Sequence, residues 1–168
     1  LKQKLNYYFG NKYDGLLDKR IIVVTGDTSK PGFGLETSEL DSLAKDTDVV
    51  INSSANVAHF GNYSKFYNTN VQSVKYIVDF CKNYDLKLYH ISTISVTGFD
   101  LDLSYLYYKK RKWFNRNKDI VFDENDLYIG QIIENVYARS KFEAETHLLN
   151  AISKRFRWIH SKNGTFDA

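Results

Sequence analysis

The sequence predicts an α/β domain built on a doubly wound parallel sheet, and three observations support this fold class. Short β-branched runs alternate with helix-like segments that are long enough to cross over a sheet. The runs are continuously apolar, as expected of strands that are buried on both faces. Polar residues follow the carboxyl end of each run, where ligands bind in sheets of this kind.

The composition is ordinary for a soluble globular protein. The 168 residues are 43% hydrophobic and 26% charged, and they are enough for one domain with a core. A net charge of +3 does not indicate a nucleic-acid partner, and no apolar run is long enough to span a membrane. The single cysteine, Cys81, excludes an internal disulfide framework and fits a cytoplasmic protein; it is expected to be a buried apolar residue, with a reactive thiol as the alternative. The histidines show no metal-binding spacing, so no metal site is expected.

The N-terminal quarter contains the first expected strand. Residues 1–9 have an amphipathic helical pattern, and residues 10–19 are expected to form a polar connection. The β-branched run over residues 21–24 predicts a buried strand that ends at Gly26-Asp27. Residues 28–36 are expected to form a loop around the only proline.

The middle of the chain has the clearest alternation of elements. A helix is expected over residues 35–45 and a second strand over residues 48–54. The polar loop 55–62 leads to a helix over residues 70–84, and the third strand covers residues 86–92. Histidine 90, on this strand, is expected to be a satisfied core residue.

The last part of the chain is less regular. Residues 99–126 show no periodic pattern and are expected to be an insertion loop. A helical pattern covers residues 135–153, and the apolar stretch 156–159 could be a further strand. All of residues 1–168 are expected to form part of one domain.

Two groups of residues suggest chemistry. Because the carboxyl ends of parallel strands meet at one edge of a sheet, Asp27, residues 53–56 and Thr93 are expected to lie at one rim. Tyr137 and Lys141 are four residues apart and so share one face of their helix. A cation beside a phenol favours the ionised phenol and makes it a usable proton donor. The plainer alternatives are an exposed Tyr137–Lys141 pair, a strand cap at Thr93 and a simple turn at Asp27.

Thr93, Tyr137 and Lys141, in this order, resemble the catalytic layout of the extended short-chain dehydrogenase/reductase superfamily. Several further segments are similar to thioester reductase domains, the terminal reductases of nonribosomal peptide synthetases and carboxylic acid reductases. The matching segments follow one another in order from about residue 20 to about residue 150: Gly26-Asp27 with residues 29–35, residues 48–59, Asn70-Val71, residues 90–96, residues 122–127, Gly130-Gln131 and residues 137–145.

The resemblance implies a Rossmann-like NAD(P)-binding oxidoreductase domain. It implies that a carrier-protein-bound acyl or peptidyl thioester is reduced with NADPH to an aldehyde, and in a second round to an alcohol; NADH remains an alternative cofactor. The phosphopantetheinyl carrier protein is then the expected partner, with neither nucleic acid nor membrane. The implied catalytic residues are Thr93, Tyr137 as general acid and Lys141. The implied cofactor-binding residues are Asp27, Thr28, Ser54, Ala55, Asn56, Asn70, Tyr137 and Lys141.

One departure from the family pattern limits this interpretation. The Gly-rich turn of the first βα unit, which would hold the cofactor pyrophosphate, is absent, and Gly32-Phe33-Gly34 does not replace it because it follows Pro31 in a loop. The basic residue that would select a 2′-phosphate is missing with it, so NADPH rests on the resemblance alone. The chain also contains no methionine, and we expect a fragment with an incomplete fold that could bind the cofactor poorly and could be inactive alone.

Other functions remain open. One is another extended dehydrogenase, such as a fatty acyl-CoA reductase or a nucleotide-sugar epimerase. Another is a truncated, non-catalytic interaction module. The aromatic and basic residues 105–113 belong either to a solvated insertion loop, to a surface that docks an acidic carrier protein, or to an RNA-binding patch.

Overall fold

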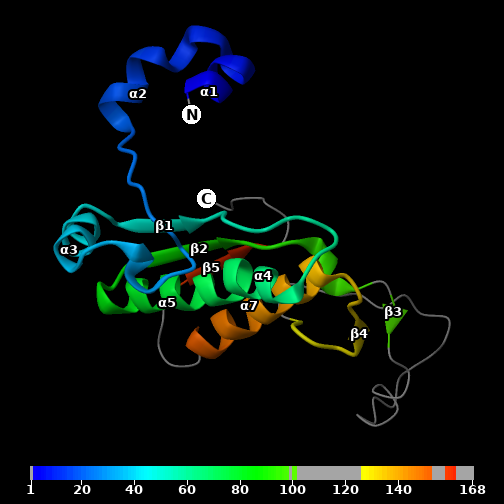
Figure 1. Ribbon diagram of the computed structural model, residues 1–168. Helices are drawn as coiled ribbons and strands as arrows, with labels where there is room; N and C mark the ends of the chain where they lie inside the picture. The colour runs from blue at the N-terminus through cyan, green and yellow to red at the C-terminus, as the bar shows by residue number, and fades with distance from the viewer. Residues whose placement is uncertain (1, 99, 102–125, 153–157, 162–168) are drawn as a thin grey trace.

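A three-stranded parallel sheet is the centre of the computed structural model (Figure 1), which describes residues 2–98, 100–101, 126–152 and 158–161. The strand order is β1-β2-β5, with β1 at Val49–Asn52, β2 at Lys87–Ile91 and β5 at Trp158–Ser161. The register places Asn52 beside His90 and Leu88 beside Trp158. The predicted α/β class with a parallel sheet is confirmed, and so is the last strand.

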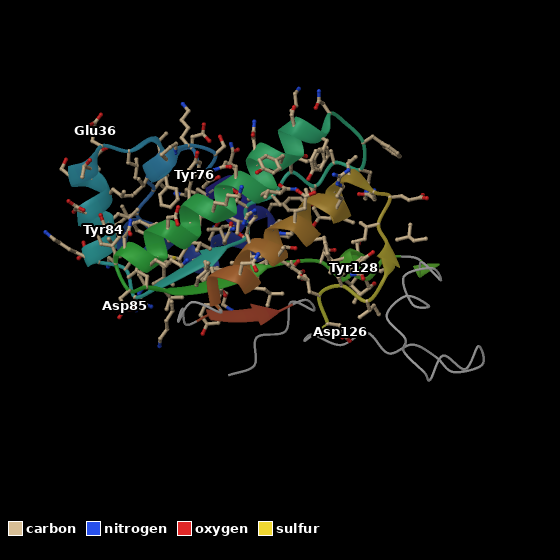
Figure 2. The ribbon with its side chains drawn as sticks, turned by 90° about the horizontal axis from the view of Figure 1, so that it is seen from below. Glu36, Tyr76, Tyr84, Asp85, Asp126 and Tyr128 are labelled. Atoms are coloured by element: carbon tan, nitrogen blue, oxygen red, sulfur yellow. The ribbon has the colours of Figure 1, made fainter. Side chains whose placement is uncertain are left out.

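Two helices cover one face of this sheet. They are α5 (Ser73–Asn83) and α7 (Val136–Ile152), which lie side by side in both Figure 1 and Figure 2. Their apolar stripes meet the sheet in one core, which includes Val74, Ile77, Val78, Cys81, Leu88, Ala144 and Leu148. Fully burying a residue such as Leu148 stabilises the fold by about 1.5–3 kcal/mol. Burial also raises the pKa of the Cys81 thiol to about 12, so Cys81 is a structural core residue.

The helical run before α5 begins earlier than the periodicity predicts. It starts with α4 (Tyr63–Phe66), continues through the π-helix η3 (Tyr67–Gln72) and passes directly into α5. The Asn62 side chain starts the run by accepting a hydrogen bond from the Ser64 amide. The helix expected over residues 35–45 is present as α3 (Thr37–Lys45), which a capping box between Glu36 and Glu39 opens.

The N-terminal segment differs most from its prediction. Helix α1 (Lys2–Phe9) is present as expected, but the polar connection is instead helical, with η1 at Gly10–Tyr13 and α2 at Asp14–Arg20. Figure 1 shows α1 and α2 set apart from the sheet. The predicted strand over residues 21–24 is wrong: this run is irregular, and the Ile22 side chain is 91% exposed. A strand needs a hydrogen-bonding neighbour, and none of the described strands pairs with this run.

The first sheet strand is covered on one side only. Val50 and Asn52 of β1 point to the helix-covered face, whereas Val49 and Ile51 are exposed on the other face. The prediction that this strand is buried on both faces is therefore wrong, because no described helix covers the second face.

The insertion predicted over residues 99–126 lies almost wholly outside the described residues. Its described start is β3 (Asp100–Leu101), which pairs antiparallel with β4 (Gln131–Ile132). Gly98 precedes β3 with a φ of +71°, and a Cβ at this position would lie 2.5 Å from the Ile132 carbonyl oxygen, so only glycine fits. The short helix η2 (Pro31–Gly34) occupies the predicted proline loop. Within the described ranges, no helix is long and apolar enough to cross a membrane.

Candidate active site

The carboxyl edge of β1 and β2 is where most of the predicted site residues meet. Asn52 and His90 are register partners in these parallel strands, so the chain leaves both strands at neighbouring points. The segment with Ser54, Ala55 and Asn56 follows β1, and Ser92-Thr93 follows β2. The register therefore places Thr93 and the Ser54–Asn56 segment at one edge of the sheet.

Thr93 caps the short helix η4 (Ile94–Thr97) at this edge. Its hydroxyl oxygen accepts a hydrogen bond from the Ser95 amide at 3.3 Å, and the hydroxyl can donate to the Ser95 side-chain oxygen at 3.3 Å. Thr93 thus acts as a cap at the end of the strand, which is the plainer of the two expectations for this residue. Thr93 is half-buried, and both of its contacts are long for hydroxyl hydrogen bonds.

Asn135 fixes the start of the helix that carries the proposed proton donor. Its side-chain oxygen accepts hydrogen bonds from the amides of Tyr137 at 2.8 Å and Ala138 at 3.2 Å. Its side-chain nitrogen lies 3.5 Å from the His59 carbonyl oxygen, in the loop that follows β1. Asn135 thus holds Tyr137 in the first turn of α7, close to that loop.

Asn70 joins the β1 loop to α7. Its side chain is 1% exposed and projects from the π-helix η3, a rare conformation that is frequent at functional sites. Its side-chain oxygen accepts a hydrogen bond from the Asn56 amide at 2.6 Å. Its side-chain nitrogen donates to the Asn56 carbonyl at 3.0 Å and to the Ser140 hydroxyl at 2.8 Å. The Ser140 hydroxyl donates in turn to the Tyr137 carbonyl oxygen at 2.7 Å. Asn70 therefore fixes the loop and the helix relative to each other.

Lys141 is buried one turn after Tyr137, with 3% of its surface exposed. Its side-chain nitrogen donates to the Ile91 carbonyl oxygen at 2.6 Å and lies 3.3 Å from His90 Nε2. Burial lowers the pKa of Lys141 to about 8, although the negative charge of Glu145 opposes the shift. Both protonation states of Lys141 are therefore accessible near neutral pH.

Tyr137 is half-buried and shares the helix face of Lys141. Within the described residues, no hydrogen bond joins its hydroxyl to Lys141 or to Thr93. The structure therefore places the three predicted catalytic residues at one edge without linking them directly, and their catalytic roles stay predictions.

Asp27 lies in a compact turn beside α5. Its carboxylate accepts hydrogen bonds from the Ser29 amide at 2.9 Å and the Ser29 hydroxyl at 2.6 Å, and these bonds hold its pKa below the ordinary value. The Asp27 amide donates to the Phe33 carbonyl at 2.7 Å, and the Phe33 ring packs edge-on against Phe80 of α5 at 5.2 Å. Both the carboxylate and the backbone amide of Asp27 therefore stabilise this turn.

Thr28 belongs to the same turn and is half-buried. Within the described part of the chain, no hydrogen bond connects Asp27 or Thr28 with the Ser54–Asn56 segment. The predicted cofactor contacts of both residues therefore stay predictions, while Asn56 and Asn70 are in direct contact.

Sequence reasoning missed several residues of this edge. His90 is the satisfied core histidine that was expected, but it also contacts Lys141, and Asn52 contacts His90. Ser140 and Asn135 position the first turn of α7. Glu145 is 2% exposed and accepts a hydrogen bond from the Ser92 hydroxyl. The only sequence signal for Asn52 and His90 is that each is a polar residue within an apolar strand.

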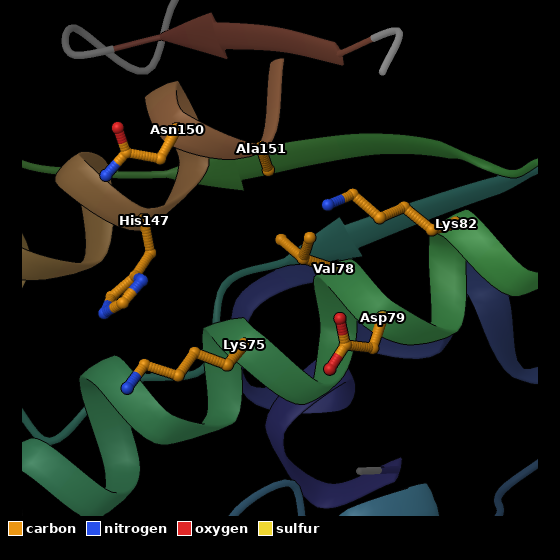
Figure 3. Close-up of a pocket in the computed structure, with 7 residues that line it drawn as sticks. All are labelled: Lys75, Val78, Asp79, Lys82, His147, Asn150 and Ala151. Atoms are coloured by element: carbon orange, nitrogen blue, oxygen red, sulfur yellow. The ribbon is translucent and has the colours of Figure 1, made fainter. Parts of the chain in front are cut away.

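A separate pocket lies between α5 and α7 (Figure 3). Its volume is about 190 Å³, and its lining residues are Lys75, Val78, Asp79, Lys82, His147, Asn150 and Ala151. Burial and the charge of Lys75 lower the pKa of His147, with Glu143 opposing the shift. The pocket shares no residue with the edge described above. Among the described residues, no group of three or more potential ligands could hold a metal ion.

A family model described as male sterility protein, which represents an NAD-binding family, matches residues 1–160. The chain belongs to this family. The match covers nearly the whole chain, including every residue of the candidate site.

Relatives of this male sterility family domain include reductases and large synthetases. The L-2-aminoadipate reductase large subunit of Candida glabrata is 31% identical over 135 residues, which are 79% of this chain and 10% of that protein. The polyketide synthase-nonribosomal peptide synthetase pyiS of Pyricularia grisea is 35% identical over 79 residues, which are 47% of this chain and 2% of that protein. The chain thus spans a tenth or less of either relative.

A solved thiolation-reductase di-domain from an archaeal nonribosomal peptide synthetase has a similar fold. Its TM-score is 0.73 at 29% sequence identity, and the match covers 95% of this chain and 31% of that chain. Together with the relatives, this similarity confirms the resemblance to terminal reductase domains and the Rossmann-like fold.

The family implies a nicotinamide cofactor, and the residues of the edge fit one end of such a molecule. The Ser54–Asn56 segment combines an exposed serine with two half-buried residues, and Asn70 fixes its backbone. Tyr137 and Lys141 supply a phenol and an amine from the neighbouring helix. A Gly-rich turn for the pyrophosphate is not among these 168 residues. The edge therefore offers a polar loop, a phenol and an amine to such a cofactor.

Proposed function

We propose that this chain contributes the proton-delivery side of an NADPH-dependent reductase that releases a carrier-bound acyl or peptidyl thioester as an aldehyde. One observation carries the proposal. The buried Asn70 network holds the loop after β1 against the helix turn that presents Tyr137 and Lys141. Such preorganisation is what a proton donor needs, because a small misplacement costs much of its effect.

In this proposal, NADPH held at this edge would be the source of the hydride that reduces the thioester carbon. Tyr137 donates a proton to the developing oxyanion, and the Thr93 hydroxyl donates a second hydrogen bond to the same oxygen. Lys141 lies one helical turn after Tyr137, and its side-chain nitrogen would donate a hydrogen bond to the ribose of the cofactor, which either protonation state can do. Thiol loss then gives the aldehyde, and a second round would give the alcohol.

The carrier-protein partner is supported by the similar proteins. The solved neighbour is a thiolation-reductase di-domain of a nonribosomal peptide synthetase, and pyiS is a synthetase of the same type. The aromatic and basic residues 105–113 are the proposed docking surface for an acidic carrier, and they lie outside the described residues.

The first test replaces Tyr137 with phenylalanine in the full-length protein. Loss of a general acid should lower the turnover of a carrier-bound thioester by about 10²–10⁴-fold, with the folded state retained. NADPH oxidation at saturating thioester measures the effect. Tyr76→Phe is the matched control, because Tyr76 is also half-buried, lies on α5 (Figure 2) and makes no described side-chain hydrogen bond. Near-normal turnover of Tyr137→Phe would contradict the proposal.

A non-catalytic interaction module is the second candidate. The observation in its favour is that, within the described residues, no hydrogen bond joins the Tyr137 hydroxyl to Lys141 or Thr93. The two candidates differ in cofactor binding. Titration of the full-length protein with NADPH and with NADH, followed by nucleotide fluorescence, should give saturable binding for the reductase and none for the module. The same titration measures the preference between the two cofactors.

A further inference from the structure

Three buried polar side chains contact one another in sequence at the carboxyl edge of the sheet. Asn52 ends β1, His90 is its register partner in β2, and Lys141 reaches them from α7. Each is at most 4% exposed. Asn52 Nδ2 lies 3.0 Å from His90 Nδ1, and His90 Nε2 lies 3.3 Å from Lys141 Nζ. Buried groups of this kind are retained when their donors and acceptors match.

The orientation of the Asn52 amide is fixed by the backbone. Its side-chain oxygen accepts a hydrogen bond from the Ser54 amide at 3.1 Å. Its side-chain nitrogen, which can only donate, therefore faces His90 Nδ1. A hydrogen bond between them requires that Nδ1 carries no proton.

This constraint sets the tautomer of the histidine. A neutral His90 without a proton on Nδ1 carries it on Nε2, and that nitrogen faces Lys141. An ammonium group has three donors and no acceptor, so it cannot accept this proton. A neutral amine can accept it and still donate to the Ile91 carbonyl oxygen at 2.6 Å. The geometry of His90 thus matches the amine form of Lys141.

We propose that Asn52 and His90 form a relay that fixes the Nε2–H tautomer of His90 and favours the neutral amine of Lys141. His90 is then a positioning residue for the catalytic helix, and this role rests on the proposed part of Lys141 in the reduction. The relay links Asn52, at the end of β1 and just before the Ser54–Asn56 segment, to the Lys141 amine, which lies one helical turn after Tyr137.

The charged groups around Lys141 act in opposite directions. His90 approaches from β2, and its Nε2–H group disfavours the ammonium. Glu145 lies one turn further along α7 and accepts a hydrogen bond from the hydroxyl of Ser92, the residue after β2. Its negative charge favours the ammonium form of Lys141. Burial works with His90 and lowers the pKa of Lys141 to about 8. The relay therefore acts on a group whose two forms are close in free energy.

The tautomer can be measured on the unmodified protein. ¹⁵N-edited NMR of the full-length protein, without ligand, distinguishes a protonated ring nitrogen from an unprotonated one. His90→Gln identifies the signals of His90 among those of the other histidines. We expect an unprotonated Nδ1 and a protonated Nε2. A protonated Nδ1 in the wild type would overturn the relay.

A single isosteric change should reverse the relay. In Asn52→Asp, one carboxylate oxygen would still accept a hydrogen bond from the Ser54 amide. The other carboxylate oxygen would accept a hydrogen bond from a protonated His90 Nδ1. His90 Nε2 would then offer a lone pair to the Lys141 ammonium. The midpoint of the Lys141 titration, followed by the ¹³C shift of its Cε, should rise by about one to two pH units, the size of one hydrogen bond to a charged group.

The matched control is Asn62→Asp. Asn62 also accepts from the amide two residues ahead, the Ser64 amide at 2.9 Å, but it is exposed at the start of α4. It adds the same charge and should change neither the tautomer nor the titration of Lys141. Equal shifts in the two variants, or an unchanged tautomer in a folded Asn52→Asp protein, would count against the relay.

These measurements separate the relay from the proposed function, because they need no substrate. A protonated Nδ1 with an inactive Tyr137→Phe variant would overturn the relay alone. The expected tautomer with normal turnover of Tyr137→Phe would overturn the proposed function and leave the relay in place.

Discussion

At the scale of single residues, the candidate site depends on buried amides more than on charges. Asn70 makes three hydrogen bonds with its side chain and is almost fully buried. Two of them go to the backbone of Asn56 and therefore fix the loop itself. An apolar side chain in its place would leave that backbone and the Ser140 hydroxyl without these partners, which is costlier than the loss of an exposed hydrogen bond.

Asn70→Ala should therefore lower the free energy of unfolding by about 1–3 kcal/mol. Urea unfolding of the full-length protein measures the change. Asn68→Ala is the matched control: Asn68 lies in the same π-helix, is exposed, and makes no side-chain hydrogen bond with the described residues. Equal losses in the two variants would show that the network around Asn70 contributes nothing beyond helix propensity.

The residue scale also shows what the sequence can and cannot predict about the site. Tyr137 and Lys141 could be found because both lie on one helix, where spacing alone fixes their relation. The contact between Asn52 and His90 joins residues 38 positions apart, and it exists only because the two strands pair in one register. Sequence periodicity does not report register, so His90 could be predicted as buried but not as a neighbour of Lys141.

At the scale of elements, α5 and α7 were predictable because each has an apolar stripe that packs on the sheet. Residues 21–24 have an equally strong β-branched pattern and still form no strand, since a strand depends on a neighbour that periodicity does not supply. Where a helix begins and ends depends instead on its capping residues. Asn135 is such a cap, and it sets the turn that carries Tyr137.

Asn135→Ala should destabilise the protein by about 0.5–2 kcal/mol, the usual cost of losing an N-terminal cap. Asn135→Asp should cost much less, because aspartate accepts the same two amide hydrogen bonds and its charge suits the positive end of the helix dipole. Chemical denaturation of both variants checks the difference. If the alanine and aspartate variants were equally stable, the cap would not be what starts α7.

At the scale of the whole molecule, the buried lysine links stability to pH. Burial lowers the pKa of Lys141 from 10.5 in the unfolded chain to about 8 in the folded protein. Between these values the unfolded state binds more protons than the folded state, so stability rises as the pH rises through this window. Below about pH 8 the folded protein carries the full cost of a buried ammonium, which is on the order of 3 kcal/mol.

Replacing Lys141 with methionine removes this cost, since methionine fills a similar volume without a charge. Lys141→Met should therefore be more stable than the wild type at pH 7 by up to about 3 kcal/mol, and the difference should shrink towards pH 10. Other groups titrate in the same window, so the quantity to measure is the difference in unfolding free energy between variant and wild type at each pH. Lys65→Met is the control, because Lys65 is exposed on α4 and its replacement removes the same charge without changing a buried site. The opposite result would be a stability of Lys141→Met, relative to the wild type, that is lower at pH 7 than at pH 10. It would mean that Lys141 is held as a fully paired ammonium and that the amine form has no part in the site.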